Sequence, residues 1–79
     1  MERKLKLIWD FKGPNALNTA KHHIIHLKEY AIAEKLKTEE TGIVTVNTMH
    51  SYAFLVVFDS EMKKVRDALK PHRGQIHQS

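Results

Sequence analysis

The chain has 79 residues, a net charge of +4 at pH 7, six histidines and no cysteine. This length suits one hydrophobic core, so we expect residues 1–79 to form a single domain with roughly 3 to 5 kcal/mol of net stability, unless a metal ion or self-association adds to it. No stretch has the length and apolar character of a signal peptide or a membrane span, so we expect a cytoplasmic protein that is neither secreted nor inserted in a membrane.

An alternating pattern near the start of the chain predicts a half-buried strand from Leu5 to Phe11. Apolar residues occupy its odd positions, and its even positions carry mostly charged side chains. Gly13 and Pro14 interrupt the pattern, because Pro cannot donate to a strand ladder but fits the first turn of a helix. We therefore expect a helix to begin at this point, with Gly13 or Asn15 as its cap.

A long helix is predicted from about Asn15 to Lys37, since this segment is rich in Ala, Leu, Lys and Glu and has neither Gly nor Pro. At about 100° per residue its apolar residues form two stripes. The stripes are Ala20, Ile24, Leu27 and Ala31 on one side and Ile25, Ile32 and Leu36 on the other, with Lys21, Lys28 and Lys35 between them. Either both belong to one wide buried face crossed by lysine stems, or the second stripe meets another copy of the chain.

Two β-rich segments, Ile43 to Val46 and Ser51 to Phe58, flank a turn and predict an antiparallel hairpin. Both faces of the second segment are apolar, which is typical of a strand at the centre of a sheet. Asp59 to Glu61 then supply a cap and an acidic first turn for a short helix that ends before Pro71. Residues 74–79 contain one large apolar residue and are expected to form either a flexible tail or a short edge strand.

These elements predict an α+β fold of order β-α-β-β-α, a two-layer sandwich with two helices on one face of an antiparallel sheet. The order resembles that of ferredoxin-like, or split βαβ, domains and of ACT-type domains, without a full fourth strand. The likeness concerns element order alone and implies no activity. Without a fourth strand, one edge of the first strand is open, and an open apolar edge is a template for pairing with another chain.

We therefore expect a homodimer, formed either through the edge of the first strand or through the second stripe of the long helix. The corresponding function is that of a small non-enzymatic binding or regulatory module whose ligand the sequence does not identify. Catalysis is not expected, because the chain has no cysteine nucleophile, no Gly-x-Ser-x-Gly motif and no pair of carboxylates in an apolar setting.

A histidine cluster on the long helix suggests an alternative function, the binding of zinc or another divalent transition metal. His22 and His26 lie one turn apart, so both imidazoles can reach one ion, and Glu29 is near enough to ligate or orient it. His50, in the predicted hairpin turn, is a further candidate ligand. The competing interpretation is that these histidines are solvated surface residues and that the protein has no cofactor.

The loop before the long helix is a candidate anion site. A helix start presents free amides, and Lys12, Gly13 and Asn15 would hold a small phosphate or carboxylate there. A tight turn explains the same residues without any ligand.

The second helix and its exit are basic and suggest a third function, nucleic-acid binding through Lys63, Lys64, Arg66 and Arg73. A solvated outer helix face is the competing interpretation. We identify no aromatic strand signature of an RNA-binding sheet, although the open sheet face is expected to offer Ile8 and Tyr52 as a stacking surface.

Overall fold

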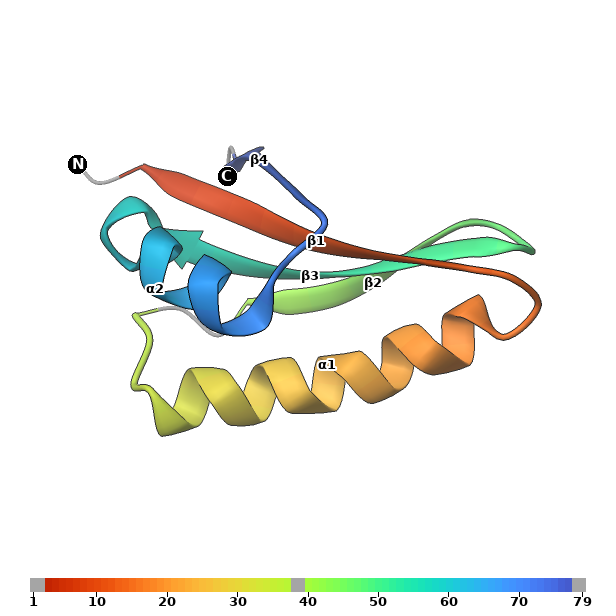
Figure 1. Cartoon of the computed structure of the whole chain (residues 1–79), viewed down its shortest axis with the longest axis horizontal. Helices are drawn as coiled ribbons and strands as arrows, with labels where there is room; N and C mark the ends of the chain where they lie inside the picture. The colour runs from red at the N-terminus through yellow and green to blue at the C-terminus, as the bar shows by residue number, and fades with distance from the viewer. Residues whose placement is uncertain (1–2, 38–39, 78–79) are drawn as a thin grey trace.

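The computed structural model describes residues 3–37 and 40–77, which form a two-layer α+β structure (Figure 1). The elements in chain order are β1 (Lys4–Lys12), α1 (Ala16–Ala33), β2 (Thr41–Asn47), β3 (His50–Phe58), α2 (Asp59–Leu69) and β4 (Arg73–His77). The strands form one antiparallel sheet in the order β2-β3-β1-β4. Both helices pack on one face of this sheet, as expected. Within the described ranges, no helix combines the length and the apolar character needed to span a membrane.

The core lies between the helices and the odd-numbered side chains of β1 and β3. Leu7 and Trp9 of β1 and Leu55 of β3 belong to it, together with Leu27 of α1 and Val65 of α2. The odd positions of β1 are apolar in the sequence, so the alternating pattern sets which face of the strand the helices cover. The predicted alternation of the first strand is confirmed.

The two apolar stripes of α1 have different environments. Ile24 and Leu27 of the first stripe are buried, whereas Ile25 and Ile32 of the second are 56% and 64% exposed. The helix ends at Ala33, earlier than predicted, because Lys35 adopts a left-handed conformation with φ of 53° and the chain turns back. The stripes therefore do not form one wide buried face.

The predicted hairpin is confirmed, and its strands are longer than expected. β3 lies between β2 and β1, in agreement with the prediction that a strand with two apolar faces is central. In the turn, Met49 N–H donates to Asn47 Oδ1 at 2.8 Å, and Gly13 N–H donates to Met49 O at 2.7 Å. The second bond joins the hairpin turn to the loop before α1.

The prediction that a full fourth strand is lacking is wrong, because β4 pairs with residues 4–8 of β1. Beyond β4, His72 N–H donates to Ile8 O and Asp10 N–H donates to His72 Nδ1, each at 2.9 Å. The chain's own C-terminal segment thus occupies the edge that was expected to be open. A dimer through this edge of β1 is not compatible with the structure. Residues 78 and 79 of the predicted tail lie outside the described residues.

Candidate binding face on the sheet

The even-numbered side chains of β1 and β3 point to the side of the sheet without helices, which we call the open face. Directly paired residues share a face, so the register identifies the neighbours from β2 and β4 as well. The open face comprises Lys4, Lys6, Ile8, Asp10 and Lys12 of β1, His50, Tyr52, Phe54, Val56 and Phe58 of β3, Gly42 and Val44 of β2, and Arg73, Gln75 and His77 of β4. It therefore combines aromatic rings with several cations.

A cation lies over the ring of each aromatic residue on the open face. The distances from the cation to the ring centroid are 4.5 Å for Lys6 over Phe54, 5.2 Å for Arg73 over Tyr52, and 5.6 Å and 5.3 Å for Lys4 and Lys37 over Phe58. A cation is attracted to the face of an aromatic ring and not to its edge. The flat faces of these rings, rather than their edges, are therefore the surfaces that meet polar groups.

Apolar side chains on the open face are buried although no helix covers them. Ile8 is 1% exposed and Val56 is 0% exposed. Their cross-strand neighbours are Phe54 and Arg73 for Ile8, and Lys6 for Val56. Aromatic rings and the aliphatic stems of long cationic side chains provide this cover. The open face is thus a positively charged surface whose long side chains shield the apolar residues beneath them from solvent.

Gly42 fixes the position of the Phe54 ring. A Cβ atom added at Gly42 would lie 2.6 Å from two carbons of that ring, a distance at which the ring has to move. The absence of a side chain at Gly42 therefore lets Phe54 lie close over the backbone of β2.

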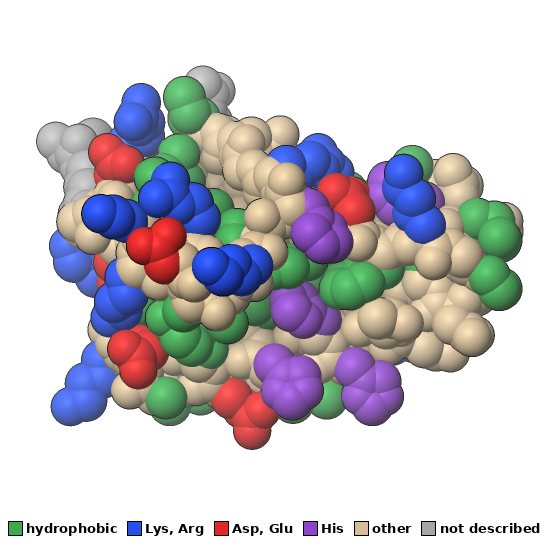
Figure 2. Space-filling view, in the orientation of Figure 1, with side chains coloured by type: hydrophobic (Ala, Val, Ile, Leu, Met, Phe, Trp, Pro, Cys, Tyr) green, Lys and Arg blue, Asp and Glu red, His purple; other side chains and the backbone are tan. Residues whose placement is uncertain are grey.

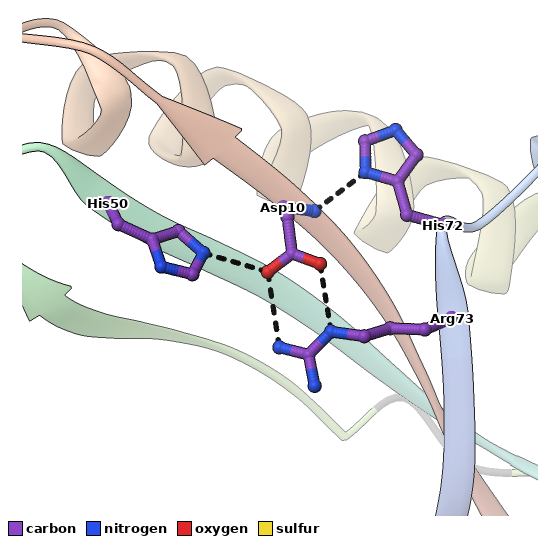
Figure 3. Close-up of polar contacts among 4 residues, drawn as sticks. All are labelled: Asp10, His50, His72 and Arg73. Carbon is purple, nitrogen blue, oxygen red and sulfur yellow. Dashed lines mark hydrogen bonds and ion pairs between the residues drawn. The ribbon is translucent and has the colours of Figure 1, made fainter.

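A polar cluster around Asp10 borders the aromatic residues (Figure 3). Arg73 donates to both carboxylate oxygens, from Nε at 2.8 Å and from Nη2 at 3.1 Å, and His50 Nε2 lies 2.9 Å from Oδ1. The Asp10 side chain is 19% exposed. The hydrogen bonds from Arg73, followed by that from His50, outweigh the effect of burial and lower the pKa of Asp10 to about 2, and the same bond raises the pKa of Arg73. This cluster joins β1, β3 and β4 and holds Arg73 over Tyr52.

At the other end of the open face, His77 Nε2 lies 3.3 Å from Glu40 Oε2. His77 belongs to β4 at one edge of the sheet, whereas Glu40 lies beside β2 at the other edge and accepts a bond from Val56 N–H at 2.9 Å. This contact therefore spans the inner strands near Val56. Tyr52 and Phe54 lie away from this pair, in the half of the face that also holds Asp10 and Arg73.

His23 lies on the opposite side of the sheet, between aromatic rings. Its ring centroid is 5.0 Å from that of Trp9 and 5.5 Å from that of Phe11. Its buried Nε2 has no hydrogen-bond partner among the described residues. Burial, with smaller contributions from His26 and His72, lowers the pKa of His23. Figure 2 shows several histidine side chains gathered in this part of the surface, over and beside α1.

The four candidate metal ligands do not come together. His50 is bound to Asp10 on the open face, whereas His22, His26 and Glu29 are exposed on α1, with 3.6 Å between His26 Nδ1 and Glu29 Oε1. In the part of the chain that the structure describes, no group of three or more His, Asp or Glu residues is arranged to hold a metal ion. A site that uses His22 and His26 stays a prediction.

The candidate anion site at Lys12, Gly13 and Asn15 lies at the start of α1. Asn15 is the N-cap residue, but its side chain makes no capping hydrogen bond. The Gly13 amide, which the prediction needed for an anion, donates to the hairpin turn instead. The tight-turn interpretation accounts for these contacts, and anion binding here stays a prediction.

The four basic residues predicted to bind nucleic acid are divided between the two sides of the sheet. Lys63, Lys64 and Arg66 lie on α2, where Lys64 Nζ is 3.4 Å from Glu34 and Arg66 Nε is 3.5 Å from Asp67. The guanidinium of Arg73 lies on the open face with Asp10. The sequence predicted Ile8 and Tyr52 as a stacking surface on that face, but Ile8 is 1% exposed and offers no such surface. Phe54, Phe58, Lys4 and Lys6 were not predicted as part of it. The signal was present, because lysines at even positions of β1 share a face with aromatic residues of β3 once the two strands are paired.

An apolar groove of about 350 Å³ lies between α2 and β4 on the helix-bearing side. It exists because α2 is short and leaves Ile76 of β4 uncovered, at 56% exposure. Leu5, Met62 and Pro71 also line it, and Arg66 is at its border. The groove is separate from the aromatic residues of the open face.

The chain was also compared with protein-family models, curated protein sequences and solved structures. No match was found in any of the three comparisons.

Proposed function

We propose that this protein binds single-stranded nucleic acid on the open face of its sheet. The observation that carries the proposal is the pair of half-buried rings, Tyr52 and Phe54, each of which has a cation over its flat face. Every nucleobase has a flat π-face, so aromatic side chains beside a positively charged surface are the common elements of single-strand binding sites. In this proposal a base replaces Lys6 over the Phe54 ring and Lys6 moves to a phosphate, whereas Arg73 keeps its pair with Asp10 and borders the base at Tyr52.

The spacing of the rings supports a single strand over a duplex. Tyr52 and Phe54 are alternate residues of one strand, so they are separated by about 6.7 Å. Stacked nucleotides rise by only about 3.4 Å each, so successive bases reach both rings only when they are splayed apart.

The charges around the rings support the binding of phosphates. Lys6 and Lys12 extend from β1 beside Tyr52 and Phe54, and Lys4 follows at the other end of the same strand. Asp10 is already neutralised by Arg73 and His50. Glu40, which is paired with His77, is a second carboxylate at this face among the described residues and opposes a phosphate chain at the Phe58 end. We therefore place the ligand across the half of the face that holds Tyr52 and Phe54.

We further propose a fold class and a cellular location for the protein. The order β-α-β-β-α-β, with both helices on one side of the sheet, supports assignment to the ferredoxin-like class, whose open sheet face is the site of base stacking in one large group of RNA-binding modules. A cytoplasmic location and a non-enzymatic role agree with this function.

Fluorescence anisotropy with short labelled single-stranded oligonucleotides tests the proposal. Tyr52→Leu and Phe54→Leu each keep an apolar side chain on the open face and remove the π-face, so each is expected to weaken binding by about 5-fold to 150-fold, since one base–ring stack contributes about 1 to 3 kcal/mol. Phe11→Leu is the matched control, because Phe11 is a half-buried aromatic residue of β1 on the helix-bearing side. It should leave the affinity unchanged.

Charge is tested in the same assay. Lys6→Ala/Lys12→Ala should weaken binding and reduce its salt dependence by about 1.4 in log–log slope, since each phosphate contact contributes about 0.7. Lys63→Ala/Lys64→Ala on α2 is the control with the same change in net charge. Equal losses in the two double variants, or binding that Tyr52→Leu and Phe54→Leu leave intact, would refute the open-face site.

A further inference from the structure

The outer edge of β2 is a second surface at which another chain can pair. Among the described residues, β3 pairs with one side of β2 and no strand pairs with the other. Residues 41–47 contain no charged residue and no proline. Lysine, proline and other charged residues are the features that normally keep an exposed edge strand from pairing with another chain. β2 therefore lacks the residues that normally prevent an edge strand from pairing with another chain.

The backbone groups that face outward from β2 follow from one hydrogen bond. Val56 N–H donates to Glu40 O at 2.9 Å, and bonded and non-bonded pairs alternate along an antiparallel ladder. Residues 42 and 44 consequently bond to β3 as residue 40 does. Thr41, Ile43 and Thr45 direct their N–H and C=O groups away from the sheet.

From this geometry we infer that a second copy of the chain pairs antiparallel with β2, with the two-fold axis at Ile43. Ile43 then lies opposite Ile43 of the other copy, and Thr41 lies opposite Thr45. Each of these pairs exchanges two N–H···O bonds, which satisfies the outward-facing groups of both copies. The result is one continuous sheet in which both open faces point to the same side.

Side chains on the open face fit this register. Val44 is an exposed apolar residue of β2, and the two-fold axis places it beside Gly42 of the other copy. The Phe54 ring lies close over Gly42, so Val44 gains an apolar neighbour where no side chain obstructs it. The pairing also brings no like charges together within the strands, because residues 41–47 are uncharged.

The helical layer adds apolar surface on the same flank. His23 of α1 packs on Trp9 of β1, and Ile25 and Ile32 lie on the side of α1 turned away from His23 and therefore away from β1. The exposed second stripe of α1 thus lies toward the β2 edge. Lys21 and Lys28 share that flank, so we expect salt to strengthen the dimer by screening the repulsion between the lysines of the two copies.

Sedimentation velocity of the full chain tests the inference, and the wild type is expected to show a dimer at micromolar concentration. The double variant Thr41→Asp/Thr45→Asp places like charges directly opposite each other in the inferred register, so it should sediment as a monomer. Thr41→Lys/Thr45→Lys should do the same. An equimolar mixture of the two double variants should restore a dimer, because opposite charges then face each other.

A backbone test uses Thr45→Pro, which removes an N–H group that points away from β3 and is compatible with an edge strand. It should abolish the dimer, whereas the matched control Thr45→Ser keeps the N–H group and should retain it. A compact monomer for the wild type overturns the inference. So does a dimer that persists in both charged double variants, which would place the contact on another surface.

The dimer does not depend on the proposed nucleic-acid function, and salt separates the two. Added salt should weaken oligonucleotide binding and maintain or strengthen the dimer. A chain that binds oligonucleotides as a monomer would contradict only the dimer, and a salt-stable dimer that binds none would contradict only the proposed function.

Discussion

The two faces of the sheet bury apolar side chains equally well by different means. Val56 and Val57 are neighbours in β3, and each is 0% exposed, but Val57 lies under the helices and Val56 lies on the open face. Side chains that the helices hold in place cover Val57, whereas the stems of lysines and aromatic rings of the sheet cover Val56. The difference shows that exposure alone does not distinguish a rigid core from a sheet surface that is covered by long, flexible side chains.

The largest expected effect comes from comparing these two valines. Val57→Ala leaves a cavity between helix and sheet that a rigid surrounding does not refill, so it should lower the free energy of unfolding by about 2 kcal/mol. Val56→Ala should cost about 1 kcal/mol or less, because the flexible side chains above it collapse into the space. Urea denaturation measures both. Equal losses would mean that the open face is packed as rigidly as the core.

The Asp10 cluster provides the next test, because it joins β4 to the open face. Asp10→Asn should lower stability by about 1 to 2 kcal/mol through loss of the charge-assisted bonds to Arg73 and His50. Asp67→Asn, at the exposed pair with Arg66 on α2, is the control and should have almost no effect. A similar loss in both variants would show that the cluster is no more than another surface ion pair.

The pH dependence of the same cluster has a definite sign. The pKa of Asp10 is lowered from its ordinary value of 3.8 to about 2, so the folded protein holds this proton less readily than the unfolded chain. Its contribution to stability is complete above about pH 4 and disappears as the pH falls toward 2. In this range the melting temperature should fall more steeply with decreasing pH for the wild type than for Asp10→Asn.

A smaller effect is expected at His23 on the helix-bearing side. Since burial lowers the pKa of His23 from its ordinary value of 6.5, the unfolded chain takes up the proton first, and stability should decrease as the pH falls below about 6.5. His23→Phe removes this dependence and the buried unpaired Nε2, and should raise stability at neutral pH by about 1 kcal/mol. His22→Gln on the exposed side of α1 is the control. If the stability of His23→Phe depends on pH as that of the wild type does, this account is contradicted.

The sequence predicted the elements that alternation and helical periodicity define. β1, the hairpin, α2 and the buried stripe of α1 lie close to their expected positions. The end of α1 was predicted too late, because the left-handed turn at Lys35 involves a residue type that favours helices. Such a turn depends on the return of Leu36 to the core, which is a tertiary contact.

β4 was not predicted as a full strand because its stability does not come from a pattern of apolar side chains of its own. Ile76 is its one large apolar residue, and the strand is held by backbone pairing with β1 and by the Asp10–Arg73 pair, which joins residues far apart in the chain. The candidate site could not be predicted for a similar reason, because its residues come together only through the pairing of the strands. Lys6 and Phe54 become neighbours only when β1 and β3 are paired in this register.

The most direct test of the open-face site is an amide-resolved NMR titration with a short single-stranded oligonucleotide at low salt. The account predicts that the largest shifts occur at Lys6, Tyr52, Phe54 and Arg73, and that the amides of α2 change little. Shifts concentrated at Lys63, Lys64 and Arg66, with the strands unaffected, would instead place any binding on the basic helix and contradict the account.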